Sequence, residues 1–97
     1  MWILKAEGDN MKILVVDDDA AILEAIQITL ELEGYVVMTA KDAKAALETA
    51  YHVKPKLVVL DVRIAGDDGR DVAKQLKRSP QTADIPIIMM SAHPNVQ

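Results

Sequence analysis

Two apolar runs that each end in aspartate constrain the fold of this chain more than any other feature. Ile13–Val16 is followed by the aspartates Asp17 to Asp19, and Leu57–Leu60 is followed by Asp61. Short runs rich in valine and isoleucine predict buried strands. If both strands end at one edge of a sheet, at least three carboxylates meet there, and their repulsion raises each pKa. A hard divalent cation such as Mg²⁺ would relieve that repulsion, because it prefers oxygen ligands.

The rest of the chain alternates predicted strands with predicted helices. β-branched content indicates the strands, and amphipathic spacing without glycine or proline indicates the helices. The expected strands are 12–16, 35–40, 56–60 and 85–90, and the expected helices are 20–33, 41–52 and 71–78. We expect Asp19 to cap the first helix and Gly34 to end it. Turn chemistry predicts a loop over 65–69, in which Asp68 and Gly69 have a structural role at the start of the last helix.

This alternating order predicts an α/β fold with a parallel sheet that is covered on both faces. Sites in such sheets lie at the carboxyl ends of the strands, near a topological switch point. Asp17, Asp18, Asp61 and Ser91 all lie at the carboxyl ends of predicted strands. We therefore expect these four residues to converge at one edge of the sheet.

Length and composition predict the number of domains and the kinds of partner that this chain can bind. Ninety-seven residues make one small domain. We read 11–97 as that domain and 1–10 as an N-terminal extension, because Met11-Lys12 looks like a natural start. A net charge of −4 gives no support for binding to nucleic acid or to a membrane surface. The chain has no cysteine and no apolar run that approaches a membrane span, which fits a cytoplasmic protein.

The spacing of the acidic and hydroxyl positions resembles that of the receiver domain of two-component response regulators. The resemblance runs from Met11 to about Ala92, and its motif positions are Asp17-Asp18, Asp61, Asp68-Gly69 and Ser91-Ala92. It implies a flavodoxin-like, doubly wound parallel sheet. We expect that fold truncated to about four strands in the order 2-1-3-4 and three helices, without the last strand and its flanking helices.

The resemblance also implies a role for each site residue. Asp61 would be the phosphoacceptor, phosphorylated by a sensor histidine kinase or by a small phosphodonor such as acetyl phosphate. Asp18 and Asp61 would hold Mg²⁺ directly together with the backbone carbonyl of Arg63, and Asp17 would act through water. Ser91 would donate a hydrogen bond to a phosphoryl oxygen. Such a protein is not an enzyme beyond its own phosphorylation and slow dephosphorylation.

Three departures from the family pattern leave the function open. Ala65 stands where the family usually has proline, and Ser91 where it usually has threonine. A family lysine at the end of a fifth strand has no counterpart in these 97 residues. The leading hypothesis is a stand-alone receiver-type signalling protein of a two-component phosphorelay. The alternative is a degenerate receiver that acts as a dimerising or docking module without efficient phosphorylation.

A remote alternative comes from the enzyme class. Haloacid-dehalogenase-like phosphatases carry an Asp-x-Asp-x-Thr/Val motif after their first strand, and 17–21 (Asp-Asp-Asp-Ala-Ala) fits half of it. Ala21, where that motif has threonine or valine, and the short chain favour a receiver domain over a phosphatase.

The absence of the last strand and helices predicts an apolar face and an open edge at 85–90. Surfaces of this kind mark association sites. We expect the apolar extension Trp2–Leu4 to help cover this surface, and we expect a symmetric homodimer through it.

Overall fold

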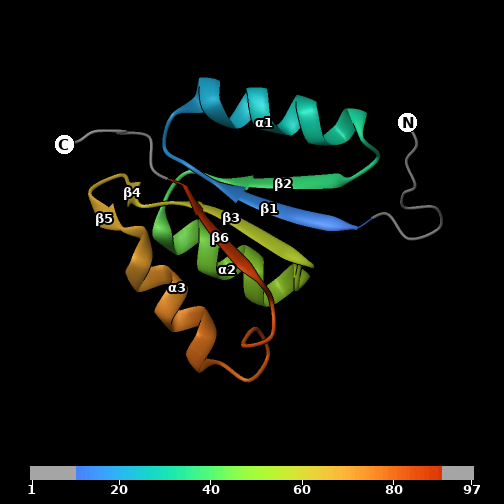
Figure 1. Ribbon diagram of the computed structural model, residues 1–97. Helices are drawn as coiled ribbons and strands as arrows, with labels where there is room; N and C mark the ends of the chain where they lie inside the picture. The colour runs from blue at the N-terminus through green and yellow to red at the C-terminus, as the bar shows by residue number, and fades with distance from the viewer. Residues whose placement is uncertain (1–10, 91–97) are drawn as a thin grey trace.

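A four-stranded parallel sheet forms the centre of the computed structural model, which describes residues 11–90 (Figure 1). The strands lie in the order β2-β1-β3-β6. Their bounds are β1 Lys12–Val16, β2 Val36–Ala40, β3 Leu57–Asp61 and β6 Ile87–Met90. Because β6 is the fourth long strand in chain order, the predicted order 2-1-3-4 is confirmed. The residues that sequence reasoning assigned to the N-terminal extension, and Ser91, lie outside the described part.

Three helices cover the two faces of this sheet. They are α1 Ala20–Leu32, α2 Ala43–Val53 and α3 Gly69–Arg78. Figure 1 shows α1 on one side of the sheet and α2 with α3 on the other. The α/β, doubly wound arrangement predicted from the sequence is therefore confirmed. None of these helices is long and apolar enough to cross a membrane.

The alternation of side chains along β1 divides the core into two clusters. On one face Leu14 and Val16 pack with side chains from α2 and α3. On the other face Ile13 and Val15 pack with Leu23 of α1. These four residues of β1 are almost fully buried. The strand that leads to the acidic site is thus fixed by packing on both sides.

The start of α1 agrees with the sequence prediction, and the start of α3 differs from it by two residues. Asp19 caps α1 as predicted, since its Oδ1 accepts from the amides of Ala21 (2.9 Å) and Ile22 (3.3 Å). Asp68 caps α3 by accepting from the Arg70 amide at 2.9 Å, so this helix begins at Gly69 rather than at the predicted position 71.

The predicted loop over 65–69 and the predicted start of the last strand were wrong in detail. Two short strands, β4 Arg63–Ile64 and β5 Asp67–Asp68, pair antiparallel, so most of that loop is a small hairpin. The last strand begins at Ile87 instead of position 85, because the Ile85 amide donates to the Thr82 carbonyl (3.0 Å) and closes a turn. Neither deviation moves the strand ends that carry the acidic residues.

Candidate functional site

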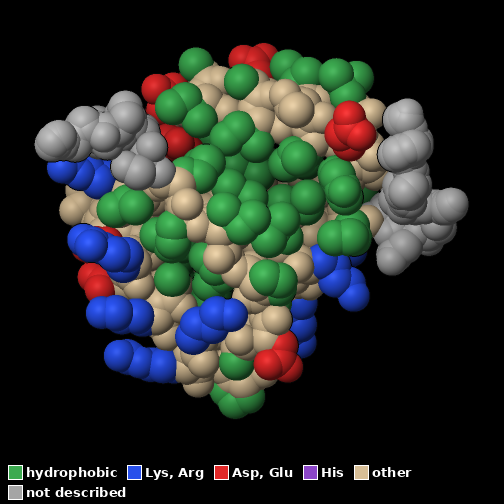
Figure 2. Space-filling model, in the orientation of Figure 1, with side chains coloured by type: hydrophobic (Ala, Val, Ile, Leu, Met, Phe, Trp, Pro, Cys, Tyr) green, Lys and Arg blue, Asp and Glu red, His purple; other side chains and the backbone are tan. Residues whose placement is uncertain are grey.

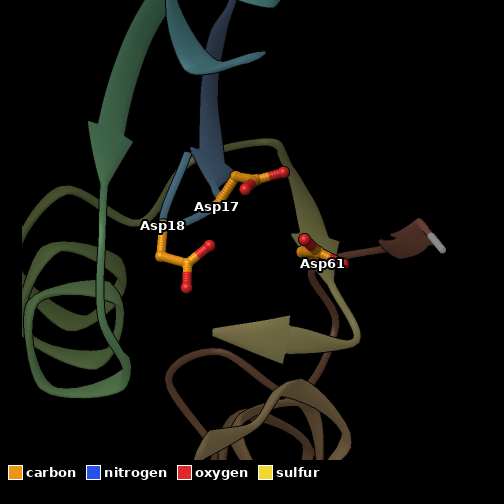
Figure 3. A group of neighbouring side chains, drawn as sticks. All are labelled: Asp17, Asp18 and Asp61. Carbon is orange, nitrogen blue, oxygen red and sulfur yellow. The ribbon is translucent and has the colours of Figure 1, made fainter. Parts of the chain in front are cut away.

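Three carboxylates meet at the carboxyl ends of β1 and β3. Asp17 and Asp18 follow β1, and Asp61 is the last residue of β3. The two strands are parallel neighbours with Val16 opposite Leu60, so their ends meet at one edge. Each aspartate offers one oxygen, and these oxygens all lie within 4.8 Å of one another (Figure 3). The predicted convergence of these three residues is confirmed, whereas the prediction for Ser91 lies outside the described residues.

The three carboxylates differ in their exposure to solvent. Asp17 is 2% exposed and Asp61 is 6% exposed, while Asp18 is an exposed side chain. Burial raises the pKa of Asp17 above its usual value, and the nearby Asp61 carboxylate raises it further. The Asp19 amide, 2.9 Å from Asp17 Oδ1, opposes that rise because it stabilises the ionised form. The site therefore holds negative charge that the protein alone stabilises poorly.

This charge predicts a measurable effect of Asp17→Asn. The raised pKa means that the folded state binds the Asp17 proton more tightly than the unfolded state. Proton binding at Asp17 therefore contributes fully to the free energy of unfolding below about pH 3.9, the pKa in the unfolded state. This contribution is lost as pH rises through the pKa in the folded state. Without divalent cations at pH 7, we expect Asp17→Asn to raise the free energy of unfolding by roughly 1 kcal/mol. Urea denaturation from pH 4 to 7 checks this, and a difference that does not shrink towards pH 4 would contradict it.

Each carboxylate also accepts one backbone hydrogen bond. Asp17 accepts from the Asp19 amide, and Asp61 accepts from the Arg63 amide at 3.4 Å. Each of these two bonds joins residues only two positions apart. Asp18 Oδ2 accepts from the amide of Ala65 at 2.8 Å, across 47 positions of the sequence. Sequence reasoning did not find this contact, because no local signal links two residues so far apart. The Arg63 amide is placed beside Asp61, and the role of the Arg63 carbonyl as a metal ligand stays a prediction.

The carboxylate of Asp68 lies near the acidic cluster but interacts with Arg70 and with the start of α3. Its carboxylate forms a salt bridge with Arg70 at 2.9 Å and caps α3. Hydrogen bonds from Arg70 lower the pKa of Asp68 to about 2. This confirms the predicted structural role of Asp68. A pocket lies between this pair and Asp18 and is lined by Asp18, Val62, Arg63, Ala65, Gly66, Asp67, Asp68 and Arg70.

Gly69 has a closer relation to the site than the sequence suggested. A Cβ at this position would collide with the carbonyl oxygen of Asp61 and lie 3.2 Å from that of Val62. The Gly69 amide donates to the Val62 carbonyl at 2.6 Å. The backbone that carries Asp61 therefore packs directly on the start of α3, and only glycine fits there.

The residues present fit a hard divalent cation. The cluster supplies three carboxylate oxygens, and oxygen is the donor that Mg²⁺ prefers. A cation there would also offset the burial of negative charge on Asp17 and Asp61.

Relatives of known sequence identify the family of this chain. Residues 13–97 match the family described as the response regulator receiver domain. The chain is 47% identical over 83 residues to the alkaline phosphatase synthesis transcriptional regulatory protein PhoP of Bacillus subtilis. It is 42% identical over 80 residues to the phosphate regulon transcriptional regulatory protein PhoB of Pseudomonas aeruginosa. These alignments cover 86% and 82% of this chain but 34% and 35% of the relatives, so the chain spans about a third of their length.

Solved structures agree as well. The N-terminal domain of a response regulator receiver protein from Methanoculleus marisnigri is 36% identical and superposes with a TM-score of 0.81, covering 88% of this chain and 69% of that one. The chemotaxis response regulator CheY4 of Vibrio cholerae is 29% identical with a TM-score of 0.82, covering 88% and 71%. With the acidic cluster at the expected strand ends and a family match over most of its length, the chain belongs to the receiver domain family of two-component response regulators.

Proposed function

We propose that this chain is an Mg²⁺-binding receiver domain that is phosphorylated on Asp61. The observation that carries the proposal is the placement of Asp61 at the end of β3, with oxygens of Asp17 and Asp18 within 4.8 Å. A phosphorylated aspartate needs positive charge beside it, and two further carboxylates are the residues that recruit it. The domain would comprise 11–97, preceded by an extension over 1–10, and the family match over 13–97 supports this division.

The phosphodonor would be a sensor histidine kinase or a small acyl phosphate. An Asp61 oxygen attacks the phosphorus in line, the bond to the donor's nitrogen or oxygen breaks, and an acyl phosphate forms on Asp61. Asp18, Asp61 and the Arg63 carbonyl would hold Mg²⁺, with Asp17 acting through water and Ser91 donating to a phosphoryl oxygen. When bound, the cation supplies charge neutralisation on the phosphoryl oxygens.

We also propose that the chain works in the cytoplasm without a nucleic-acid or membrane partner. The net charge of −4 supports the part of this proposal that concerns partners, since binding to nucleic acid or to a membrane surface is driven by positive charge. Transcriptional regulatory roles belong to the relatives by name, and this chain aligns with about a third of each.

Mg²⁺ at millimolar concentration is expected to raise the melting temperature. A ligand at tenfold its Kd stabilises the folded state by about 1.4 kcal/mol. For a domain of this size, each kcal/mol shifts the melting temperature by roughly 4–8 °C. Differential scanning fluorimetry with and without EDTA measures the shift. Asp18→Asn is expected to reduce it, while Asp67→Asn, which changes an acid of the neighbouring pocket outside the cluster, is expected to retain it. An unchanged wild-type melting temperature would refute the metal site.

A second role, as a dimerising module, is favoured by one exposed apolar face. Ile88 of β6 is opposite Val59, which packs in the α1-side cluster, so both side chains lie on that face of the sheet. Ile88 is 52% exposed, and in the described sheet β6 pairs with β3 alone. Figure 2, in which β6 lies in front with α1 above and α3 below, shows hydrophobic side chains gathered in the middle of the view, with acidic groups mainly above them and basic groups mainly below.

The charges on either side of the apolar face favour a second copy of this chain as the occupant. α1 carries Glu24 and Glu31 and no basic residue, whereas α3 carries four basic residues and one acidic residue. A two-fold axis through the face would set the acidic side of one copy against the basic side of the other. We therefore propose a homodimer through the surface around Ile88.

Sedimentation velocity tests the dimer. The wild-type chain is expected to sediment as a dimer and Ile88→Lys as a monomer, because a buried lysine without a partner opposes association. Val36→Lys is the matched control, since Val36 is 38% exposed on β2, at the opposite edge of the sheet. A wild-type monomer at micromolar concentration would contradict the proposal.

A further inference from the structure

The solvent side of α3 carries a basic stripe that consists of Arg70, Lys74 and Arg78. These residues are four positions apart, so they lie one above another along the same side of the helix. At a rise of about 1.5 Å per residue, the stripe is about 12 Å long, with about 6 Å between neighbouring residues. All three residues are exposed. Figure 2 shows Lys and Arg side chains along the side of the molecule where α3 lies in Figure 1.

The position of Lys74 shows that the basic stripe points away from the core. Val72 and Leu76 are each 1% exposed and pack in the core cluster between α3, α2 and the sheet. Lys74 is two positions from each of them, and residues two apart on a helix differ in direction by about 200°. The stripe is therefore on the opposite side of α3 from the packed side.

The fourth basic residue of α3, Lys77, already has partners within the chain. Its amine donates to the carbonyl of Ala83 at 3.0 Å and to that of Ile85 at 2.7 Å. These carbonyls belong to the segment that leads into β6, so Lys77 fastens this segment to α3. We therefore do not include Lys77 in the basic stripe.

The charges of the stripe are not balanced by carboxylates of the same chain. Among the described residues, Arg70 forms a salt bridge with Asp68 at 2.9 Å, and Lys74 and Arg78 form none. Like charges four positions apart on a helix destabilise it slightly. The helix dipole favours Arg78 in the last turn, but its effect does not extend to Lys74 in the middle of the helix. The stripe thus gives α3 little stability of its own, whereas an acidic partner would relieve the repulsion within it.

We propose that the basic stripe binds an acidic helical segment of a partner protein. Carboxylates four positions apart on a partner helix repeat at the same spacing of about 6 Å, so three of them match the three basic residues. A nucleic acid fits less well, because its phosphates continue beyond the stripe. Beyond the Arg70 end they would meet Asp67 and Asp71, which are both exposed.

The basic stripe begins beside the acidic site. Arg70 lines the pocket that Asp18 also lines, so a partner helix on the stripe would end next to the carboxylate cluster. This contact goes beyond the proposed phosphorylation and does not require it. It is also separate from the apolar face around Ile88, since Lys74 and Arg78 extend from the solvent side of α3.

Binding of a designed peptide tests the stripe directly. The probe is a fluorescent alanine-rich peptide of about 20 residues, long enough to form a helix, with glutamate at every fourth position. One control peptide has glutamine at those positions, and a second has the same glutamates in one block. Fluorescence anisotropy is measured at about 150 mM salt, where weak long-range attraction is screened. We expect the Kd of the spaced glutamate peptide to be about tenfold lower than that of the glutamine peptide. Equal binding of the spaced and blocked peptides would overturn the proposed match in spacing.

A pair of double variants distinguishes the stripe from the overall charge of the chain. Lys74→Gln with Arg78→Gln is expected to raise the Kd of the spaced peptide about tenfold. Lys41→Gln with Lys44→Gln changes the net charge by the same amount at exposed positions at the start of α2, and is expected to leave the Kd within about twofold of the wild type. All four substitutions are at exposed positions, so both variants should keep the wild-type melting temperature within a few degrees. An equal loss of binding in the two double variants would overturn the proposal.

The remaining outcomes identify another occupant or separate this inference from the proposed function. Tighter binding of a single-stranded DNA oligonucleotide than of the spaced peptide would overturn the proposal in favour of a nucleic acid. A change in sedimentation of the Lys74→Gln, Arg78→Gln variant, without peptide binding by the wild type, would overturn it in favour of a second copy of this chain. Peptide binding by a chain that gains no phosphoryl group would support the stripe and contradict phosphorylation of Asp61. Phosphorylation without peptide binding would do the reverse.

Discussion

Asp61→Asn is expected to abolish phosphorylation of this chain. With Mg²⁺ and acetyl phosphate, the wild-type mass should rise by one phosphoryl group, and the variant's mass should not change. An asparagine amide is a poor nucleophile, and no other cluster carboxylate stands at the end of β3, the strand between β1 and β6. Intact-mass spectrometry measures the adduct directly. If Asp61→Asn gives as much adduct as the wild type, the phosphoacceptor is another residue.

Two further variants sharpen this experiment. Asp18→Asn keeps the acceptor but removes a carboxylate from the cation site, so we expect a slower gain of the same adduct. Asp67→Asn lies outside the cluster and should behave as the wild type. Mg²⁺ binding without any wild-type adduct would favour the docking module over the phosphorelay. Sustained release of phosphate from a small ester would favour the phosphatase hypothesis.

Asp61→Asn should also stabilise the protein in the absence of divalent cations. Asp61 is 6% exposed and lies beside the buried Asp17, so the substitution removes one of two close negative charges. The variant that loses phosphorylation is therefore expected to melt at a higher temperature in EDTA. Loss of the adduct together with a higher melting temperature would show that the variant is folded and lacks only the acceptor carboxylate.

Gly69→Ala is expected to have the largest effect on stability. Its Cβ would collide with the Asp61 carbonyl oxygen and crowd that of Val62, both backbone atoms that cannot rotate away. Either α3 moves or the end of β3 moves, and overpacking of this kind costs about 3 kcal/mol or more. We expect the melting temperature to fall by more than about 10 °C. Mg²⁺ affinity should fall as well, because Asp61 is displaced.

Gly66→Ala is the control for the loss of a glycine. Gly66 has a φ of +88°, but a Cβ there would meet no atom within 4 Å. The cost should therefore be only the strain of a left-handed backbone, about 1–2 kcal/mol. Similar losses in the two variants would contradict the steric explanation for Gly69.

The acidic site was predictable from the sequence because it depends on local signals and one topological rule. Apolar runs identified the strands that precede Asp17 and Asp61, and parallel neighbouring strands necessarily bring such ends together. The caps at Asp19 and Asp68 were predictable for a similar reason, since a capping side chain bonds amides only two or three positions away.

Other features were not predictable because they arise between distant segments. The sequence did not indicate that Asp17 is buried while its neighbour Asp18 is exposed. The loop over 65–69 contains turn residues, but its pairing as β4 and β5 was not apparent. Ile85 was assigned to a strand by its β-branched side chain, whereas its amide closes a turn with Thr82.

By itself, the sequence determined the order of strands and helices, the edge of the sheet that bears function, and the three carboxylates that meet there. These depend on periodicity and on short-range chemistry, which a linear pattern records. The tertiary structure decided that Gly69 packs on the backbone of Asp61 and that the Ala65 amide holds Asp18. Both contacts depend on a backbone group, the Gly69 backbone against the Asp61 carbonyl and the Ala65 N–H against the Asp18 carboxylate. Backbone groups are nearly the same in every residue, so no sequence pattern distinguishes these contacts.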